Sequence, residues 1–481
     1  MKKKELLMLS IILLGACIVR LYRFDNPIAD WHSWRQADTS AVSRNFVKNG
    51  FDILHPHFDD LSNVASGKDN PHGYRFVEFP LYNLAQAGMF VFFGIFTIEE
   101  WGRIVTIISS LLTIIFLYKI VSKYSTKNAG LLTAFFYAFL PFNIYYGRVI
   151  LPDPSMIMAI LGGFYFFDRW IEKTQKEIKL NQDFFLSILF TTSALLLKPY
   201  ALFFTLPFFY ISYVRFGFSG LKKWRLWLYA ISALIPLLWW RNWMQQYPEG
   251  IPVSNWLFNE GNVRIKRSFY YWIFYERLTK LILGTIGLPL LLFSVGYTIR
   301  ACIKKYKAYR IFLFFLLSSL LYTIVMAKGN LQHDYYQILI MPTLAMFLGI
   351  GVAQIINIKK FRVVILATLI FLILAMFSSS WSLVRDYFNI NNHAMITAGK
   401  AADKLLPKDA KVIALYNGDT SFLYQTNRQG WTSLQKSLPE MVTMGAQYLI
   451  LLNPTESDYT GWGKEYTIVS NSAEYLILKL H

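Results

Sequence analysis

A dense group of chemically active side chains follows the first hydrophobic segment of the chain. The stretch 30–50, DWHSWRQADTSAVSRNFVKNG, places two carboxylates, Asp30 and Asp38, close to His32 and Arg35. Carboxylates can accept a proton in general base catalysis, and imidazole and guanidinium groups bind hydroxyl and phosphate oxygens. Because lipid does not tolerate this density of charge, the stretch is expected to lie at a membrane surface, in a place suited to chemistry.

The same stretch has the pattern of an amphipathic helix from Asp38 onward. Its apolar residues recur at helical spacing on one side, and its polar residues lie away from that side. The apolar set is Ala41, Val42, Phe46 and Val47, and the polar set is Asp38, Ser43, Arg44 and Lys48. The helix is predicted to lie along the membrane with its apolar side inward.

Three more ionisable residues stand between apolar runs, where an unpaired charge costs several kcal/mol. Asp153 lies in GRVILPDP, where two prolines hold a turn rigid, and Arg148 lies just before it. Lys198 is the single charge in LLLKPY. Each residue also has an ordinary interpretation: Asp153 as a helix cap, Arg148 as a residue that snorkels to the interface, and Lys198 as a plain loop lysine.

A polar and aromatic cluster precedes a later apolar run in GNLQHDYYQILIMP. His333, Asp334 and Tyr335 there suit sugar hydroxyls, although interfacial tyrosines are common in membrane proteins. Glu78 stands at the start of the hydrophobic run 79–98. If that run lies in the interface, Glu78 faces the same cavity as Asp38; otherwise it is a solvated loop residue.

The composition is that of a polytopic membrane protein. Of 481 residues, 55% are hydrophobic and only 16% are charged, which a soluble core cannot accommodate. The formal net charge of +19 does not indicate nucleic acid, because the basic residues cluster in short loops between apolar runs. The two cysteines, Cys17 and Cys302, lie in or beside hydrophobic segments and indicate no disulfide framework.

Topology follows from the basic loops. If the run 79–98 lies in the interface or is re-entrant, about eleven helices cross the membrane and every basic loop faces the cytoplasm. These loops contain Lys119/Lys123/Lys127, Lys173/Lys176/Lys179, Lys222/Lys223/Arg225, Lys304/Lys305/Lys307 and Lys359/Lys360/Arg362. The N-terminus, an uncleaved first helix, is then cytoplasmic, and the loop around Asp30, the turn at Asp153 and the C-terminal tail lie outside.

Two domains are expected. Residues 1–384 form a mainly α-helical transmembrane catalytic domain whose outer loop, 24–78, carries juxtamembrane helices. Residues 385–481 change character: LPKDAKVIALYNGD indicates a strand between turns, LPEMVTMGAQYLILLNP a helix and a strand, and YTIVSNSAEYLILKL a hairpin. This tail is predicted to be a small extracytoplasmic α/β domain.

Motif searches exclude several chemistries. No GxSxG, HExxH, P-loop, GxGxxG or paired CxxC occurs in a suitable context, so hydrolase triads, zinc chemistry and nucleotide-driven transport gain no support. The histidines and aspartates of HPHFDD could bind a metal, but a solvated surface loop is favoured. The sequence requires no cofactor and leaves dependence on a divalent metal open.

The segments DWHSWRQADTSAVSRNF, EFPLYN, YYGRVILPDPSMI and QHDYYQILIMP resemble bacterial membrane glycosyltransferases of the GT-C fold. The resemblance is to the group of protein O-mannosyltransferases and aminoarabinose transferases, and within it to an HSWRQAD subgroup. It covers about the first 380 residues, through the order of the elements. It implies a GT-C bundle that transfers a sugar, with inversion, from a polyprenyl-phosphate donor to a protein, lipid or envelope glycan.

The resemblance also assigns roles. In the family a catalytic aspartate of the first outer loop is followed by glutamate; here Asp30 precedes Trp31 and Asp38 precedes Thr39, so either one is the candidate base and Asp38 is favoured. Asp153 joins them as a catalytic candidate. Arg35, Arg148 and Lys198 are the candidate phosphate ligands, because Glu78 stands where the family has a basic residue. Sugar or acceptor contacts fall to His32, Glu78, His333, Asp334 and Tyr335.

Two other functions fit the same composition. A flippase for a lipid-linked saccharide would show polar groups near the bilayer midplane and repeated halves, whereas these charges gather at one face and no repeat is visible. A polymerase or ligase of envelope glycans would use a lipid-diphosphate donor instead.

Overall fold

The computed structural model describes residues 3–173, 180–304 and 306–481, so Lys176, Lys179 and Lys305 lie outside the described residues. The chain is mainly helical and divides into two compact units. Unit 1 comprises Met1–Tyr22, Ile104–Trp240 and Ser254–Asp386. Unit 2 comprises Arg23–Arg103, Arg241–Val253 and Tyr387–His481.

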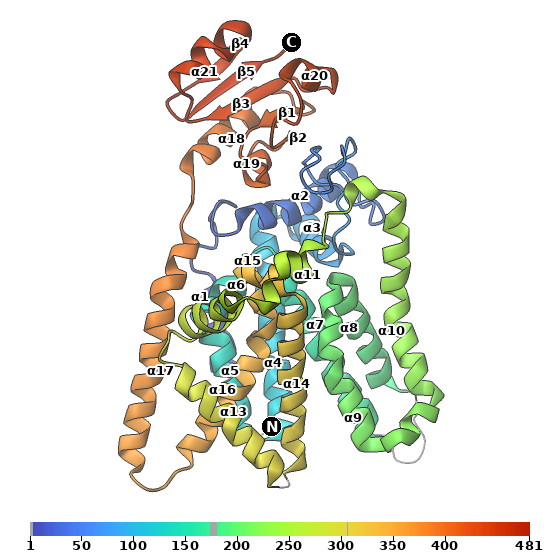
Figure 1. Cartoon of the computed structure of the whole chain (residues 1–481), viewed down its shortest axis with the longest axis vertical. Helices are drawn as coiled ribbons and strands as arrows, with labels where there is room; N and C mark the ends of the chain where they lie inside the picture. Colours follow the sequence, from blue (N-terminus) through green and yellow to red (C-terminus); the bar gives the residue numbers. More distant parts are fainter. Residues whose placement is uncertain (1–2, 174–179, 305) are drawn as a thin grey trace. The chain divides into compact units, whose positions relative to one another are not determined.

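Unit 1 is a helical bundle whose long members run side by side (Figure 1). Helix α7 packs along α8, and α16 packs against both α5 and α13. The helices are α1 (Lys3–Arg20), most of α4 (Ile98–Tyr124), α5 (Lys127–Phe139), α6 (Pro141–Tyr146), α7 (Asp153–Lys173), α8 (Gln182–Leu197), η1 (Pro199–Thr205), α9 (Leu206–Phe216), η2 (Gly217–Lys222), most of α10 (Trp224–Trp243), α11 (Trp256–Asn259), η5 (Glu260–Ile265), α12 (Arg267–Tyr270), the π-helical η6 (Tyr271–Ile282), α13 (Leu288–Ile303), η7 (Lys307–Tyr309), α14 (Arg310–Val325), α15 (Ala327–Gln332), η8 (Asp334–Ile340), α16 (Met341–Ile356) and α17 (Arg362–Val384).

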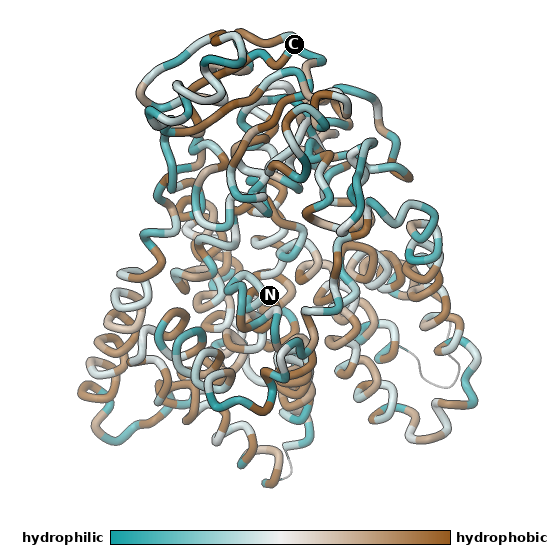
Figure 2. The backbone as a smooth tube through the Cα atoms, turned by 45° about the horizontal axis from the view of Figure 1, so that its top comes forward, coloured by the Kyte–Doolittle hydropathy of each residue, from teal (hydrophilic) through white to brown (hydrophobic). Residues whose placement is uncertain are grey.

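Five helical segments in the described part of the chain are long and apolar enough to cross a membrane. They are Ile98–Tyr124, Pro199–Lys222, Lys307–Val325, Asp334–Ile356 and Arg362–Leu405. Hydrophobic residues follow the outer helices of unit 1 (Figure 2), and α17 leaves large apolar side chains uncovered, with Val363 81% exposed. The chain therefore has the surface of a membrane protein. The prediction that about eleven helices cross stays a prediction.

The run 79–98 does not form one long helix. It breaks at Gly94, which adopts a left-handed conformation (φ 61°) and ends α3 (Leu81–Phe93). At 1.5 Å per residue, the 13 residues of α3 span roughly 20 Å, short of the roughly 30 Å hydrocarbon core. Helix α3 alone is too short to cross, which agrees with an interfacial or re-entrant segment.

Several basic groups of the sequence share one end of unit 1. The turns between α9 and α10, between α13 and α14, and between α16 and α17 all lie at the lower end of the bundle in Figure 1. They carry Lys222 and Lys223, Lys304, and Lys359 and Lys360 respectively. One-sided basic turns are what the positive-inside rule requires of a membrane protein.

Unit 2 contains a five-stranded sheet of order β2-β1-β3-β5-β4. Strand β1 is parallel to β2 and β3, and β5 is antiparallel to β3 and β4. The elements are α2 (Ser33–Asn49), α3, the start of α4, η3 (Met244–Gln246), η4 (Pro248–Gly250), the end of η9 (Arg385–Phe388), α18 (His393–Leu405), β1 (Val412–Ala414), α19 (Thr420–Gln425), β2 (Gly430–Trp431), α20 (Leu438–Thr443), β3 (Tyr448–Leu452), α21 (Glu456–Thr460), α22 (Trp462–Glu465), β4 (Thr467–Asn471) and β5 (Tyr475–Lys479). The predicted small C-terminal α/β fold is confirmed.

The compact units divide the chain differently from the domain boundary drawn in the sequence at 384/385, which stays a prediction. The outer loop and the C-terminal sheet belong to the same unit. Within it, α19 and α3 both pack against α2. The C-terminal region is thus part of the structure that holds the stretch 30–50.

Close packing between α5 and α16 depends on Gly349. A Cβ at this position would lie 2.4 Å from the backbone nitrogen of Thr133 and 2.2 Å from its hydroxyl oxygen. Because the backbone of α5 cannot yield locally, we expect Gly349→Ala to lower stability by about 1–3 kcal/mol. The measurement is thermal unfolding of the detergent-solubilised protein.

Gly296 provides the matched control for this prediction. It also lies within a helix of unit 1, α13, but a Cβ there would meet no atom within 4 Å. Gly296→Ala should therefore leave the melting temperature unchanged or raise it slightly, since alanine favours helix by about 1 kcal/mol. Equal melting temperatures for the two variants would contradict the packing argument.

Candidate active site

Asp38, in the middle of α2, is held by two partners. Arg75 Nη2 lies 2.5 Å from Asp38 Oδ2, and the Thr420 hydroxyl donates to Oδ1 at 2.6 Å. The Asp38 side chain is 3% exposed, so this ion pair and hydrogen bond lie in a buried environment. Thr420 begins α19, so the C-terminal region of the chain supplies a direct contact to this carboxylate.

A second ion pair lies beside the first. Arg35 Nη2 approaches Glu78 Oε1 at 2.6 Å, with side-chain exposures of 6% and 9%. The other carboxylate oxygen of Glu78, Oε2, is buried and has no hydrogen-bond partner among the described residues. Such an acceptor is costly unless something else satisfies it, which makes Glu78 a candidate contact for a bound group.

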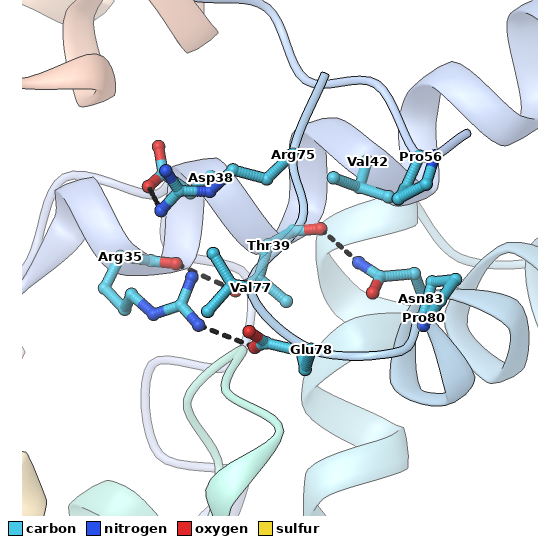
Figure 3. Close-up of a pocket in the computed structure, with 10 residues that line it drawn as sticks. All are labelled: Arg35, Asp38, Thr39, Val42, Pro56, Arg75, Val77, Glu78, Pro80 and Asn83. Atoms are coloured by element: carbon cyan, nitrogen blue, oxygen red, sulfur yellow. Dashed lines mark hydrogen bonds and ion pairs between the residues drawn. The ribbon is translucent and has the colours of Figure 1, made fainter. Parts of the chain in front are cut away.

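The two ion pairs line one pocket within unit 2 (Figure 3). Its walls come from α2, from the loop 56–78 and from α3, where Asn83 donates to the Thr39 carbonyl at 2.6 Å. The pocket has about 270 Å³ of empty volume, part of it open to solvent. Glu78 and Asp38 therefore line the same pocket, which is the alternative that the sequence tied to an interfacial run at 79–98.

Asp30 sits in a turn that is fixed from both sides. Its side chain is completely buried, and Oδ1 accepts a hydrogen bond from Gln36 Nε2 at 2.7 Å. Its carbonyl accepts from Asn391 Nδ2 at 3.0 Å, and the Trp31 ring stacks on Tyr387 at 4.9 Å. The C-terminal segment after residue 386 therefore sets the position of this carboxylate.

His32 follows in a strained conformation. Its φ of 54° places it in the left-handed region, which non-glycine residues rarely occupy. Strain of this kind costs about 1–3 kcal/mol and gathers at functional sites. Helix α2 begins directly after it at Ser33, five residues earlier than the pattern predicted, and so includes Arg35.

Unit 1 holds the other predicted acid and cation together. Asp153, the first residue of α7, is fully buried, and Lys198 Nζ lies 2.9 Å from its Oδ1. Neither oxygen of Asp153 makes a well-directed hydrogen bond within the described residues. The Lys198 ammonium also lies 5.7–5.9 Å from three tyrosine rings, those of Tyr200, Tyr335 and Tyr336. The charge of this buried ammonium is therefore balanced by Asp153 and by the faces of the aromatic rings.

Asp334 belongs to the same region of unit 1. Its Oδ1 accepts a hydrogen bond from the Tyr146 hydroxyl, and Arg277 Nη1 lies 3.5 Å from Oδ2. The His333 ring stacks on that of Tyr335 at 5.5 Å. Of the cluster predicted to bind sugar, Tyr335 thus lies beside Lys198, whereas Asp334 is engaged by groups from α6 and η6.

Arg148 is fully buried just before α7. Its guanidinium carbon lies 5.6 Å from the centroid of the Tyr145 ring. The segment after it, 149–152, is fixed by a hydrogen bond from the Thr106 hydroxyl to the Val149 carbonyl at 2.7 Å. A buried position contradicts the alternative that Arg148 snorkels to an interface.

Asp60 adds a titratable group near Asp38. The pKa of the Asp60 carboxyl is raised to about 7, mainly by burial; hydrogen bonds from Ser62 and the charge of Arg75 lower it, and the charge of Asp38 raises it. The backbone nitrogen and hydroxyl of Ser62 donate to it at 2.9 and 2.8 Å. Asp60 therefore changes charge close to neutral pH.

This raised pKa makes the stability of unit 2 depend on pH. Between about pH 4 and pH 7 the folded protein holds a proton on Asp60 that the unfolded chain has lost, so stability falls as pH rises through this window, by at most about 1.4 kcal/mol per pH unit. Asp60→Asn should flatten the dependence of melting temperature on pH. Asp69→Asn, a control in the same loop with an exposed side chain, should keep the wild-type slope.

The histidines and aspartates of HPHFDD do not converge. His55 Nδ1 pairs with Asp52 at 2.9 Å, His57 Nδ1 bonds the His72 carbonyl, and Asp59 pairs with Arg44. Among the described residues, no group of three or more His, Cys, Asp or Glu side chains is placed to hold a metal ion.

Sequence reasoning missed several residues of these clusters. Arg75 precedes the hydrophobic run 79–98, and Arg277 lies in an aromatic segment. Both could have been predicted from the sequence as cations near apolar runs. Thr420 gave no signal, because a threonine 382 positions from Asp38 is ordinary in sequence. Tyr146 and Tyr200 carried only the pattern of interfacial tyrosines.

One segment of the chain matches a known protein family, and the fold matches solved structures. Residues 80–243, which contain Arg148, Asp153 and Lys198, match the family PMT_2, dolichyl-phosphate-mannose-protein mannosyltransferase. The fold is similar to that of ArnT from Cupriavidus metallidurans bound to undecaprenyl phosphate, with a TM-score of 0.68 and 10% identity over 98% of this chain and 97% of that one. This chain has the fold of the GT-C glycosyltransferases.

Other solved structures share this GT-C fold. The apo oligosaccharyltransferase of Archaeoglobus fulgidus matches with a TM-score of 0.59 and 11% identity, over 94% of this chain and 70% of that one. AglB from the same organism, in complex with an inhibitory peptide and a dolichol-phosphate, matches with a TM-score of 0.57 and 11% identity, over 95% and 70%. A comparison with curated protein sequences finds no match. The predicted family resemblance, fold class and enzyme class are confirmed.

Proposed function

We propose that this GT-C glycosyltransferase moves a sugar from a polyprenyl-phosphate donor to an acceptor on the outer face of a bacterial cytoplasmic membrane, with inversion. The observation that carries the proposal is the buried Lys198, beside Asp153 and among three tyrosines, in the segment that matches the mannosyltransferase family. ArnT and AglB, which share the fold, have solved structures with undecaprenyl phosphate and with dolichol-phosphate respectively. These ligands support a lipid phosphate as the donor's leaving group.

Lys198 would bind the donor phosphate and stabilise the charge that develops on it as the glycosidic bond breaks. Asp153, paired with Lys198, would position the ammonium rather than take part in proton transfer. Arg148 remains a second phosphate candidate in unit 1. Tyr335 and His333 offer stacked rings to the sugar, and Asp334 offers carboxylate oxygens.

In unit 2 we assign the general base to Asp30 rather than Asp38, which reverses the preference drawn from the sequence. Both oxygens of Asp38 already have a donor, from Arg75 and from Thr420, so Asp38 fits a positioning role. Asp30 would accept the acceptor's proton while the acceptor attacks the sugar carbon opposite the phosphate, which inverts that carbon. Glu78 would hold Arg35, and His32 would fix the turn that aims Asp30.

The one-sided basic turns support an orientation of unit 1 with those turns in the cytoplasm. The topology expected from the basic loops of the sequence adds a cytoplasmic N-terminus and an outer C-terminal region. In this orientation the sugar, the acceptor and any required metal ion would all be bound on the outer face. A protein, a lipid and an envelope glycan are the acceptor classes to compare.

Transfer assays separate this function from its rivals. The purified protein is incubated with radiolabelled polyprenyl-monophosphate and polyprenyl-diphosphate sugars and candidate acceptors. Sugar transfer with release of free polyprenyl phosphate is expected from the monophosphate donor alone. Use of the diphosphate donor would indicate a polymerase or ligase, and movement of intact donor across vesicles without bond cleavage would indicate a flippase. Either result would overturn the proposal.

A further inference from the structure

A large apolar cavity opens in unit 1 among α7, α8, α9 and α10. It has about 1370 Å³ of empty space, part of it open to the surroundings. None of its described lining residues is charged. Typical members of the lining are Phe167, Leu195, Phe208, Phe209, Leu226 and Trp227.

Four hydroxyl groups in the lining, those of Thr191, Thr205, Ser212 and Tyr229, are already engaged inside the protein. The Tyr229 hydroxyl is hydrogen-bonded to Ser187 and Thr191, at 2.8 and 2.7 Å. The hydroxyls of Thr205 and Ser212 donate to backbone carbonyls of their own helices. The interior therefore offers surface for hydrocarbon chains and little for a sugar, whose hydroxyls would lose their hydrogen bonds there.

One edge of the cavity is strongly basic. Leu221 and Leu226 both line it, and the residues between them include Lys222, Lys223 and Arg225. None of these three forms an ion pair within the described chain, and Arg225 Nε is buried without a hydrogen-bond partner. The nearby cations behave differently, since Lys173 and Arg169 both pair with Asp183.

This basic edge is far from Lys198. The segment Pro199–Lys222 forms one helical candidate span, and Lys198 immediately precedes it whereas Lys222 ends it. At about 1.5 Å per residue, the two cations stand on the order of 30 Å apart. A lipid whose phosphate lies at Lys222 therefore cannot present the same phosphate to Lys198 and Asp153.

We propose that this cavity is a binding site for an anionic glycerophospholipid. Its acyl chains would fill the apolar space between α8, α9 and α10, and its phosphate would bind the edge formed by Lys222, Lys223 and Arg225. Clustered basic residues at the cytoplasmic end of membrane helices attract anionic headgroups, and an apolar groove beside them retains the chains. The site is separate from the donor-phosphate site and stands whether or not the proposed transfer reaction is correct.

Native mass spectrometry of the full-length protein in detergent tests the site. Phosphatidylglycerol, phosphatidylcholine and undecaprenyl phosphate are added in turn and in competition. We expect one retained phosphatidylglycerol per chain, with at least tenfold preference over phosphatidylcholine, and no displacement by equimolar undecaprenyl phosphate. The triple variant Lys222→Gln, Lys223→Gln, Arg225→Gln should lose that preference.

Two further variants keep the test decisive. Lys359→Gln, Lys360→Gln, Arg362→Gln removes the same number of basic residues from another turn at the same end of unit 1, and it should retain the lipid. Ala230→Trp fills the cavity without changing charge and should abolish retention. Equal loss in the control triple variant, equal binding of phosphatidylcholine, or one-for-one replacement by undecaprenyl phosphate would each overturn the proposal.

Discussion

Replacement of Asp30 by asparagine is expected to lower the rate of sugar transfer by about 10³-fold, within the range that a general base contributes. Asparagine keeps the size of the side chain, and its amide oxygen still accepts the hydrogen bond from Gln36, so the buried turn is preserved. What is lost is a group able to take the acceptor's proton. Single-turnover transfer from a polyprenyl-phosphate sugar measures this loss, and donor binding should stay within about twofold of wild type.

Asp38→Asn is the matched comparison for Asp30→Asn. It breaks a buried ion pair and leaves Arg75 without its charge partner, which typically costs about 3–5 kcal/mol of stability. The melting temperature should therefore fall clearly, while the protein that remains folded keeps transfer within about tenfold. Transfer abolished by Asp38→Asn and retained by Asp30→Asn would exchange the two roles, and full transfer by both variants would rule out a carboxylate base in this stretch.

Thr420 separates positioning from proton transfer. Thr420→Val removes the 2.6 Å hydrogen bond to Asp38 and leaves a side chain of the same shape. A positioning role predicts a reduced turnover that Thr420→Ser restores, because serine returns the hydroxyl. Failure of serine to restore activity would show that the packing of α19, rather than this hydrogen bond, determines the position of α2.

Helix α2 shows what a periodic pattern can and cannot predict. The sequence indicated a helix with apolar residues on one side and polar residues away from that side. A helix is present, but polarity does not predict its burial: Asp38 and Ser43 are buried as well as Val42. Ser43 is buried because Gln86 of α3 accepts its hydrogen bond at 2.8 Å. Periodicity reports polarity, whereas burial of a polar group depends on partners that distant segments supply.

In the candidate site, too, local sequence indicates the charged residues, whereas their partners depend on distant segments. Asp153 and Lys198 were each predicted from the cost of an isolated charge near lipid, and the ion pair is the physical answer to that cost. Their pairing was not predicted, because it needs the arrangement of α7 and α8 rather than either local sequence. Arg35 was expected to bind phosphate, but Glu78 already pairs with it, so within unit 2 its charge is largely compensated.

Lys198→Met is expected to weaken binding of the polyprenyl-phosphate donor by about 10- to 150-fold, since a hydrogen bond to a charged group contributes about 1.5–3 kcal/mol. Without this lysine, the charge that develops on the phosphate during transfer lowers the transfer rate further. Methionine keeps the unbranched shape among Tyr200, Tyr335 and Tyr336. The same change also leaves Asp153 buried without its cation, so a loss of activity alone does not separate binding from stability. Equilibrium binding of labelled donor and thermal unfolding are therefore measured together.

The double variant Asp153→Asn, Lys198→Met resolves this ambiguity. Removing both charges relieves the uncompensated carboxylate, so the melting temperature should return toward the wild-type value. If Lys198 binds the donor phosphate, donor affinity stays low although the fold has recovered. If Lys198 serves only to neutralise Asp153, affinity and transfer recover with stability, and the assignment of Lys198 as the phosphate ligand is wrong. The ion pair between Lys198 and Asp153 would then have a structural role. Arg148 would remain as the candidate in unit 1 for binding the donor phosphate.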